Sequence, residues 1–225
     1  MTSGTRGLLI LMMLLTLFAG FLDAVGYVRL GQLYLSFMSG NSTRWGMALA
    51  SGDFRVIRWG AAIIVTFVLG AMLGSLVAAA SGRLKLVCVL SSELLCLAIA
   101  LALAALSVGS AALLPIALAM GMQNATQQVI HGSDTGKTFI TGTLVSLGQA
   151  LAKTLLGRAR AADAAASLAS WCAFVSGVLL GAVSLTGLGL NHALQIATAT
   201  IGILIVIAWR LAPHTATATV ESAVG

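Results

Sequence analysis

The sequence predicts an all-α, polytopic membrane helix bundle made of two internal repeats, with six full spans and two short re-entrant or interfacial helices. Three observations carry this prediction. Hydrophobic residues make up 59% of the 225 residues, charged residues only 8%, and the mean hydropathy is +1.04; soluble domains carry about 25% charged residues. Six apolar runs approach or exceed the roughly 20 residues that cross a bilayer. One short phrase also occurs twice, about a hundred residues apart.

The elements follow in order along the chain. Two segments, about 36–51 and 138–155, are shorter or more polar and are expected to form the re-entrant or interfacial helices. Everything before residue 211 is expected to form a single membrane domain, 1–210, and the Thr/Ala-rich tail, 211–225, to be disordered because it has no core-forming pattern. The expected spans are 8–29, 57–80, 84–106, 111–131, 168–187 and 192–210.

The repeat pairs residues of about 8–106 with residues of about 111–210. Between 37–50 and 139–152, 6 of 14 positions are identical, and Gly40 matches Gly142. Upstream, with the offset shorter by one, Asp23 matches Asn124. Membrane carriers often place their site where two repeats meet. Function is therefore expected where the matched polar residues of the two halves meet.

Positive charges leave the number of spans open. Without the two short segments, each half has three spans and the halves run in opposite directions; with them, each half has four and the halves are parallel. With a cytoplasmic N-terminus, six spans place eight basic residues inside and four outside, and eight spans place seven inside and four outside with Arg44 embedded. Cytoplasmic loops carry the basic excess in both arrangements. Six spans are preferred, and reporter fusions at Asp53 and Lys85 would distinguish the two.

Asp23 is the first candidate functional residue. It lies in the second half of the first span, where an acid costs about 2.5–3.5 kcal/mol on insertion scales. Tyr27 follows one turn later on the same face. Either Asp23 pairs with Arg29 or Arg44, or it forms a cation or proton site within the bundle.

A polar stripe occupies the matching span of the second half. Asn124, Gln127, Gln128 and His131 follow at i, i+3, i+4 and i+7, which is one helical face. So many polar side chains in lipid must face protein or water. They form either a solute-lining wall or a hydrogen-bonded seam between helices. His131 either caps the span or senses pH.

The repeated phrases Ser39–Asn41 and Thr141–Thr143 bring glycine and small polar residues together. A helix that begins there would direct its positive end at the middle of the bundle; the alternative is close helix packing through small residues. Glu93 is a second intramembrane acid, which either reaches the interface near Lys85 or has a functional role. Two G-x-x-x-G pairs are expected to be helix-packing faces: Gly70 with Gly74, and Gly177 with Gly181.

Four phrases together resemble the YoaK-like family of bacterial inner-membrane proteins, a domain of unknown function. The resemblance extends from about Leu8 to Arg210. It implies a multi-pass protein of the bacterial inner membrane, and it implies no substrate or catalytic residue. The four phrases are Gly20–Tyr27, Met38–Ser42, Gly121–Ala125 and Thr141–Leu144.

The leading functional hypothesis is a small secondary transporter or channel for a polar solute or ion. The alternatives are a non-transporting membrane assembly or regulatory protein and an intramembrane enzyme. No enzyme motif is present, so no enzymatic activity is expected. The expected site is lined by Asp23, Tyr27, Asn41, Asn124, Gln128 and Thr141, with Arg44, His131 and Glu93 as candidate gate or ion-pair residues.

The expected partners are the lipid bilayer, a small polar solute or ion and a second copy of the chain in a homodimer. Neither a cofactor nor a metal is expected, because no metal-ligand spacing occurs. Nucleic acid is not expected either. The net charge is +6, but the basic residues occupy short connections between apolar runs and form no basic–aromatic patch.

Overall fold

The computed structural model describes the backbone of residues 3–131, 140–158 and 161–224, and the side chains of 6–125, 140–158, 162 and 164–212. Over these ranges the secondary structure is entirely helical and contains no strand, which confirms the all-α prediction. Two short 3-10 helices, η1 (Gly82–Leu84) and η2 (Gly109–Leu113), flank the fourth helix. The α-helices are α1 (Ser3–Arg29), α2 (Met38–Ser51), α3 (Phe54–Ala80), α4 (Lys85–Ala105), α5 (Leu114–His131), α6 (Ile140–Leu155) and α7 (Ala161–Val224).

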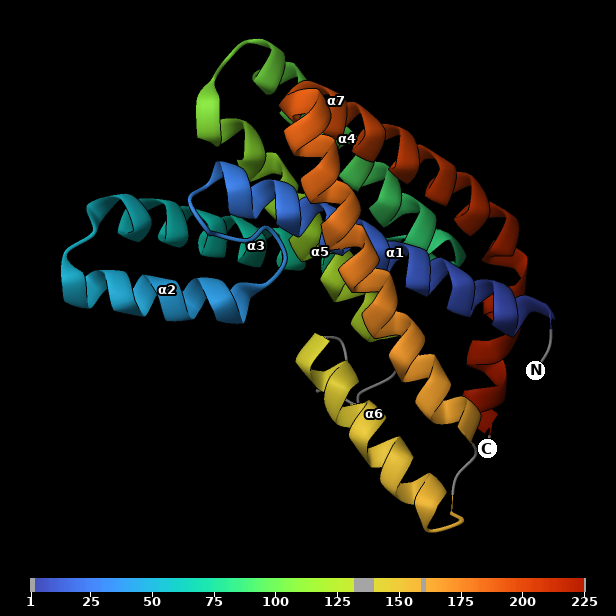
Figure 1. The fold of residues 1–225 in the computed structure, drawn as a ribbon. Coiled ribbons are helices and arrows are strands. Elements are labelled where there is room, and N and C mark those ends of the chain that lie inside the picture. Colours follow the sequence, from blue (N-terminus) through green and yellow to red (C-terminus); the bar gives the residue numbers. More distant parts are fainter. Residues whose placement is uncertain (1–2, 132–139, 159–160, 225) are drawn as a thin grey trace.

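Four helical segments of the described chain are long and apolar enough to cross a membrane: Arg6–Arg29, Phe54–Ala80, Gly82–Ala105 and Ala164–Ala212. The last segment is 49 residues long and is broken at Gly189, whose φ of 83° and ψ of 174° are not helical. The chain folds back there, so α7 consists of two arms (Figure 1). These arms contain the expected spans 168–187 and 192–210.

The remaining predicted elements also have helical counterparts. The end of η2 and α5 together cover the expected span 111–131, and α2 and α6 cover most of the two short segments at 36–51 and 138–155. The number of membrane crossings stays a prediction. The disorder expected for residues 211–225 also stays a prediction. In the structure, α7 continues as far as Val224.

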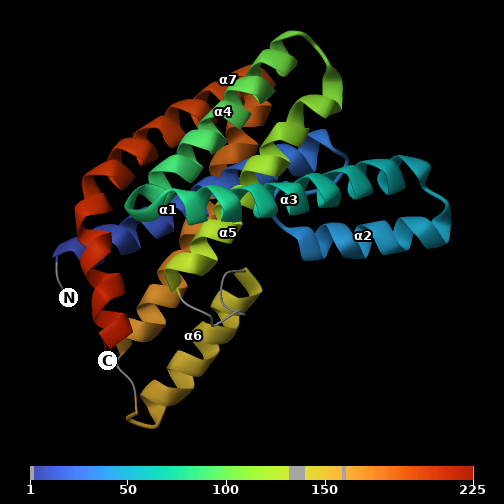
Figure 2. The ribbon, with the colours of Figure 1, turned by 180° about the vertical axis from the view of Figure 1, so that it is seen from behind.

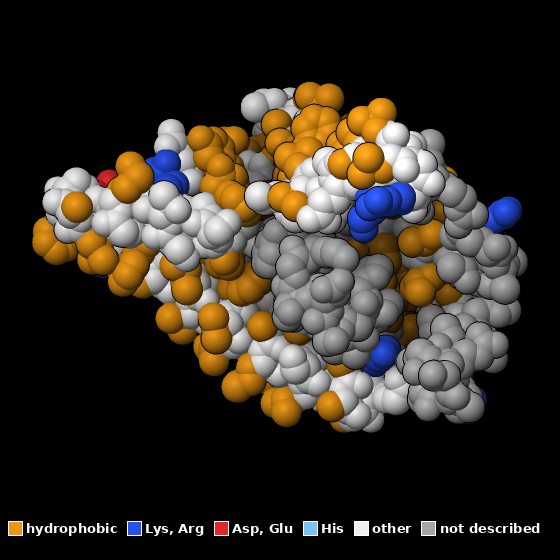
Figure 3. Space-filling model, turned by 90° about the horizontal axis from the view of Figure 1, so that it is seen from below, with side chains coloured by type: hydrophobic (Ala, Val, Ile, Leu, Met, Phe, Trp, Pro, Cys, Tyr) orange, Lys and Arg blue, Asp and Glu red, His pale blue; other side chains and the backbone are white. Residues whose placement is uncertain are grey.

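The surface carries large apolar side chains, as expected for a protein that faces lipid. Seen from below, hydrophobic side chains cover much of the described surface, and Lys and Arg appear at separate points (Figure 3). α3 exposes Val65, Val68 and Met72, and α7 exposes Leu179 and Val183, each by more than half. Apolar patches of this extent would be costly in water, so the chain is a membrane protein.

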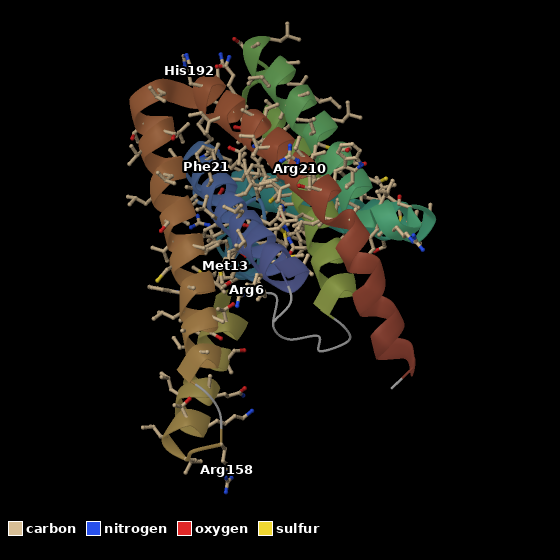
Figure 4. The ribbon with its side chains drawn as sticks, turned by 90° about the vertical axis from the view of Figure 1, so that its right-hand side faces the viewer. Arg6, Met13, Phe21, Arg158, His192 and Arg210 are labelled. Carbon is tan, nitrogen blue, oxygen red and sulfur yellow. The ribbon has the colours of Figure 1, made fainter. Side chains whose placement is uncertain are left out.

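α1 lies at the centre of the bundle and supplies much of its core. Leu11, Leu15, Phe18 and Leu22 recur at helical spacing and are at most 1% exposed. The first arm of α7 crosses α1 on one side (Figure 1), and a view from the right shows Phe21 of α1 beside this arm (Figure 4). Burial on several sides explains why α1 is apolar around most of its circumference.

Glycines allow the closest helix crossings. A Cβ on Gly20 would collide with the carbonyl oxygen of Phe174, and one on Gly177 would collide with that of Leu17. α1 and the first arm of α7 therefore cross backbone to backbone. Because side chains would hold the two backbones apart, these positions require glycine.

α3 and α5 cross in the same way. A Cβ on Gly70 would collide with the carbonyl oxygen of Leu118, and one on Gly121 with that of Phe67. A Cβ on Gly74 would lie 2.6 Å from the Cα of Met122. Both predicted G-x-x-x-G pairs are thus confirmed as packing faces, each against a helix of the other half of the chain. Seen from behind, α5 passes across α3 (Figure 2).

A tight turn connects α2 and α3 into a hairpin that extends from one side of the molecule (Figure 1). Gly52 ends α2 in the left-handed conformation, with φ at 73°. Asp53 then caps α3, because its side chain accepts hydrogen bonds from the backbone N–H groups of Arg55 (3.1 Å) and Val56 (3.2 Å). The hairpin is held further by Trp45, whose indole N–H donates to the carbonyl oxygen of Ile57 at 3.0 Å.

Candidate functional site

The segment between α1 and α2, residues 30–37, folds back along α1 and organises the first polar cluster. Gly31 and Gln32 both have positive φ, 69° and 70°, which reverses the chain where α1 ends. Leu33 and Leu35 are then fully buried against the bundle. A Cβ on Gly26 would lie 2.6 Å from Cγ of Leu35, so glycine allows this segment, here called the return loop, to lie directly on α1.

Asp23 anchors the return loop. Its Oδ1 accepts hydrogen bonds from the backbone N–H groups of Leu35 (2.8 Å) and Ser36 (2.6 Å), and its Oδ2 accepts one from the Ser36 hydroxyl (2.7 Å). The side chain is 2% exposed. These three bonds satisfy both oxygens. An ion pair of Asp23 with Arg29 or Arg44 is one of its two predicted alternatives, and the described contacts include no such pair; the three hydrogen bonds take its place.

Asn41 anchors the same loop from α2. Its Oδ1 accepts a hydrogen bond from the backbone N–H of Tyr34, and its Nδ2 donates to the carbonyl oxygen of the same residue, both at 2.8 Å. Asn41 is fully buried. Its amide therefore takes the place of a backbone partner for Tyr34, as the rule that buried backbone groups are paired requires.

Aromatic rings and an arginine cover the outer side of the loop. The ring of Tyr34 lies 5.2 Å from that of Tyr27 and 5.3 Å from that of Phe37. Burial, followed by the effects of Tyr27 and Asp23, raises the pKa of the Tyr34 phenol. Arg44 donates from Nη1 to Oε1 of Gln32 and from Nη2 to the Gly31 carbonyl oxygen at 3.4 Å, while its buried Nε has no partner.

A second polar cluster lies between α4 and α5, and the sequence pointed to only part of it. Glu93 is fully buried and Gln123 is 2% exposed. The Nε2 of Gln123 donates to Oε2 of Glu93 at 3.4 Å, and the other carboxyl oxygen, Oε1, is buried with no partner among the described side chains. Glu93 therefore points into the bundle, which corrects the alternative that it reaches the interface near Lys85.

Gln123 is the functional candidate that the sequence reasoning missed. It lies beside the predicted stripe rather than on it, because it falls one residue before Asn124. The available signal was the coincidence of two polar residues, Glu93 and Gln123, in neighbouring apolar runs. That signal does not identify contact, because α4 and α5 could meet along several faces.

The other expected site residues lie elsewhere. Asn124 is half-buried and donates from Nδ2 to the Met120 carbonyl oxygen of its own helix at 2.8 Å. Thr141 is exposed on the first turn of α6. The side chains of Gln128 and His131 lie outside the described residues. The structure thus brings Asp23, Tyr27, Asn41 and Arg44 together around the return loop, and Glu93 forms a separate cluster.

The chemistry available to the two clusters differs. In the described part of the chain, no three His, Cys, Asp or Glu side chains come together in a way that could hold a metal ion. Both carboxylate oxygens of Asp23 bind the loop, whereas one oxygen of Glu93 has no partner in the part of the chain that the structure describes. A buried polar atom without a partner costs free energy, so the Glu93 cluster is the stronger functional candidate.

Comparisons with known proteins agree with this description. A UPF0700 transmembrane protein of Rhizobium meliloti (strain 1021) is 32% identical over 167 residues, which are 73% of this chain and 70% of that protein. No solved structure matches. Residues 11–207 match the family described as "Protein of unknown function (DUF1275)". With nearly all of its helical bundle matched, the chain belongs to the DUF1275 family.

Proposed function

We propose that the protein is a small secondary transporter or channel for a polar solute or ion, with its site where the two halves of the chain meet at α4 and α5. The observation that carries this proposal is Glu93, which is fully buried and has one carboxyl oxygen without a partner among the residues that the structure describes. Glu93 follows Gly82 by eleven residues and precedes Ala105 by twelve, so it lies midway along its candidate span. An ionisable residue at that depth is costly and in membrane proteins marks a transport or proton path.

The proposal includes two structural repeats. Its support is that the glycine crossings correspond: α1 crosses the first arm of α7 as α5 crosses α3. Gly20 and Gly121 are 101 residues apart, as are the contacted Leu17 and Leu118. Gly70 and Gly177 are 107 residues apart, as are Gly74 and Gly181, and Phe67 and Phe174. The third helix of each half thus packs on the first helix of the other, which favours a site enclosed by both.

The proposal also includes a location and an assembly. The protein lies in the bacterial inner membrane with its N-terminus in the cytoplasm, because the basic residues are then in excess on the cytoplasmic side. A chain of 22.9 kDa with six spans is small for a complete carrier, which favours a homodimer. The transported solute contacts polar side chains that lie between the two halves and are shielded from the lipid.

Solute entry into vesicles tests the proposal. Protein reconstituted into liposomes is mixed rapidly with urea, glycerol or glycine, and the rate of volume change is followed by light scattering. We expect faster entry of at least one probe than in protein-free vesicles. Glu93→Gln and Gln123→Leu should return that rate to the protein-free value, because each removes one partner of the buried pair.

Ser91→Ala is the matched control, because Ser91 is exposed on α4 and its hydroxyl donates to the Val87 carbonyl oxygen of the same helix. Its rate should equal that of the wild type. If wild-type vesicles match protein-free vesicles with every probe, the transport proposal is wrong. If both pair variants retain the full rate, the assignment of the site to Glu93 and Gln123 is wrong.

One observation favours a second candidate, a non-transporting assembly or regulatory protein. Asp23 and Asn41 direct their polar atoms at the return loop, so these two expected solute-lining residues are already engaged. Asn124 and Gln128 would then form an oligomer seam. Native mass measurement of Asn124→Leu and Gln128→Leu distinguishes the candidates: loss of the oligomer with unchanged solute entry favours the seam.

A further inference from the structure

The identity of the ion that couples to transport follows from the surroundings of Glu93. From the geometry of the Glu93–Gln123 pair, we infer that Glu93 is a proton carrier, held as the neutral acid at rest and ionised only when water or solute reaches it. The inference rests on the transport function proposed above. Four observations support it, and each concerns described residues.

The first is the contrast between the two buried acids. Asp23 accepts three hydrogen bonds of 2.6 to 2.8 Å, two of them from backbone N–H groups. Glu93 accepts one, at 3.4 Å, and its other oxygen has none. A buried carboxylate needs partners at about 2.7–2.9 Å to replace its hydration. Asp23 therefore has the hydrogen bonds that a charged carboxylate needs, whereas Glu93 has only as many as a neutral acid needs.

The second is the absence of a compensating cation within the described chain. α4 packs against α3, α5, α7, η1 and η2. On α4 itself, Lys85 lies two turns before Glu93, and the cysteines at 88 and 96 are the other titratable groups. The described titratable side chains of the surrounding elements are all exposed and do not reach the pair: Arg55, Arg58, Arg83, Cys172, His192 and Arg210.

The third is the number of oxygen ligands. Hard cations such as Ca²⁺ and Mg²⁺ take six or more, mostly from carboxylates, carbonyls and water. Around Glu93, the neighbouring buried residues on α4 are Val89, Leu90, Cys96 and Leu97, which provide no side-chain oxygen. The one carboxyl and one amide that the described residues provide here cannot replace the hydration shell of a metal cation. A proton needs a single oxygen lone pair.

The fourth is the position of the pair between the halves. Glu93 belongs to the last helix of the first half and Gln123 to the first helix of the second. A movement of one half relative to the other changes this contact. In the exchange itself, an O–H bond of Glu93 breaks as the proton passes to water on one side. That water becomes hydronium and Glu93 becomes the carboxylate; the O–H bond re-forms with a proton from hydronium on the other side, and no other protein group changes its bonding.

Infrared spectroscopy of the full chain in lipid vesicles tests the inference without any transported solute. The chain contains only six Asp and Glu residues, so a protonated carboxyl band is readily assigned. At neutral pH we expect such a band in the wild type and its loss in Glu93→Gln. Gln123→Leu should keep the band and move it to higher frequency, because the carbonyl then loses its hydrogen bond.

Asp23→Asn is the matched control and should leave the band unchanged, because Asp23 has the partners of an ionised group. Absence of the band in wild-type protein at neutral pH, or its persistence in Glu93→Gln, overturns the inference. If Glu93→Gln does not insert into the membrane, the frequency shift of the carboxyl band in Gln123→Leu still tests the inference. A band without solute entry contradicts the transport proposal alone, and solute entry without a band contradicts the proton carrier alone.

Discussion

At the scale of single residues, Asp23 holds the return loop in place, and its replacement should show this. Asp23→Leu leaves the buried N–H groups of Leu35 and Ser36 without acceptors, at about 1–3 kcal/mol each. Asp23→Asn keeps Oδ1 as their acceptor, and the Ser36 hydroxyl can turn to accept from the new amide. Thermal unfolding in detergent should therefore rank wild type first, then Asp23→Asn, then Asp23→Leu.

The control for this series is Ser36→Ala, which removes only the bond of the hydroxyl to Oδ2. Its loss of stability should be smaller than that of Asp23→Leu, because both backbone bonds to Oδ1 remain. The second half of the chain already carries Asn124 at the position that matches Asp23. If Asp23→Asn is as unstable as Asp23→Leu, the charge itself stabilises the fold and the role as a loop anchor is wrong.

The sequence identified Asp23 and Glu93 because acids in apolar runs need partners, and it identified Asn41 because that residue lies in the repeated phrase. Their partners could not be predicted. Asp23 and Asn41 bind backbone atoms of the return loop, 7 to 13 residues away, and backbone atoms leave no trace in a residue pattern. Glu93 binds Gln123 30 residues away, across a contact that only the packing of α4 on α5 determines.

At the scale of elements, the glycine crossings set the spacing between helices, so adding one methyl group should separate them. Gly177→Ala places a Cβ against the carbonyl oxygen of Leu17, where backbone cannot move aside cheaply. We expect a loss of about 1–3 kcal/mol in the free energy of unfolding. Unfolding in micelles that mix a mild detergent with a denaturing one, monitored by circular dichroism, measures this loss of free energy.

Gly202→Ala is the matched control on the second arm of α7, where a Cβ would meet nothing within 4 Å. Alanine has the higher helix propensity, by about 1 kcal/mol, so this variant should be equal to or more stable than the wild type. Equal losses in Gly177→Ala and Gly202→Ala would contradict the crossing as the cause.

The elements themselves were largely predictable, and their pairing was not. Apolar length identified the long helices, and the expected spans 168–187 and 192–210 leave Gly189 between them, where the structure breaks α7. The G-x-x-x-G pairs identified Gly70 and Gly177 as packing positions. Their partners, α5 and α1, lie far along the chain, and the fit between ridges and grooves that selects them has no local signal.

At the scale of the whole molecule, the return loop decides the expected path of the chain through the membrane. The loop brings Ser36 back to the depth of Asp23, and α2 begins two residues later. Its 14 residues span about 21 Å, less than the roughly 30 Å hydrocarbon core. α2 then runs outward beside α3 (Figure 1), so Ser51 should emerge on the same side as Arg29.

Single-cysteine labelling with a membrane-impermeant maleimide in intact cells tests this path. We expect Ser51→Cys to react from outside and Arg83→Cys to react only after permeabilisation, as six spans require; Ser51 is preferred to Asp53 because Asp53 caps α3. Arg158→Cys is the control, since it is cytoplasmic with either six or eight spans. Reaction of Arg83→Cys from outside, with Ser51→Cys protected, would establish eight spans and parallel halves. The background carries alanine in place of Cys88, Cys96 and Cys172.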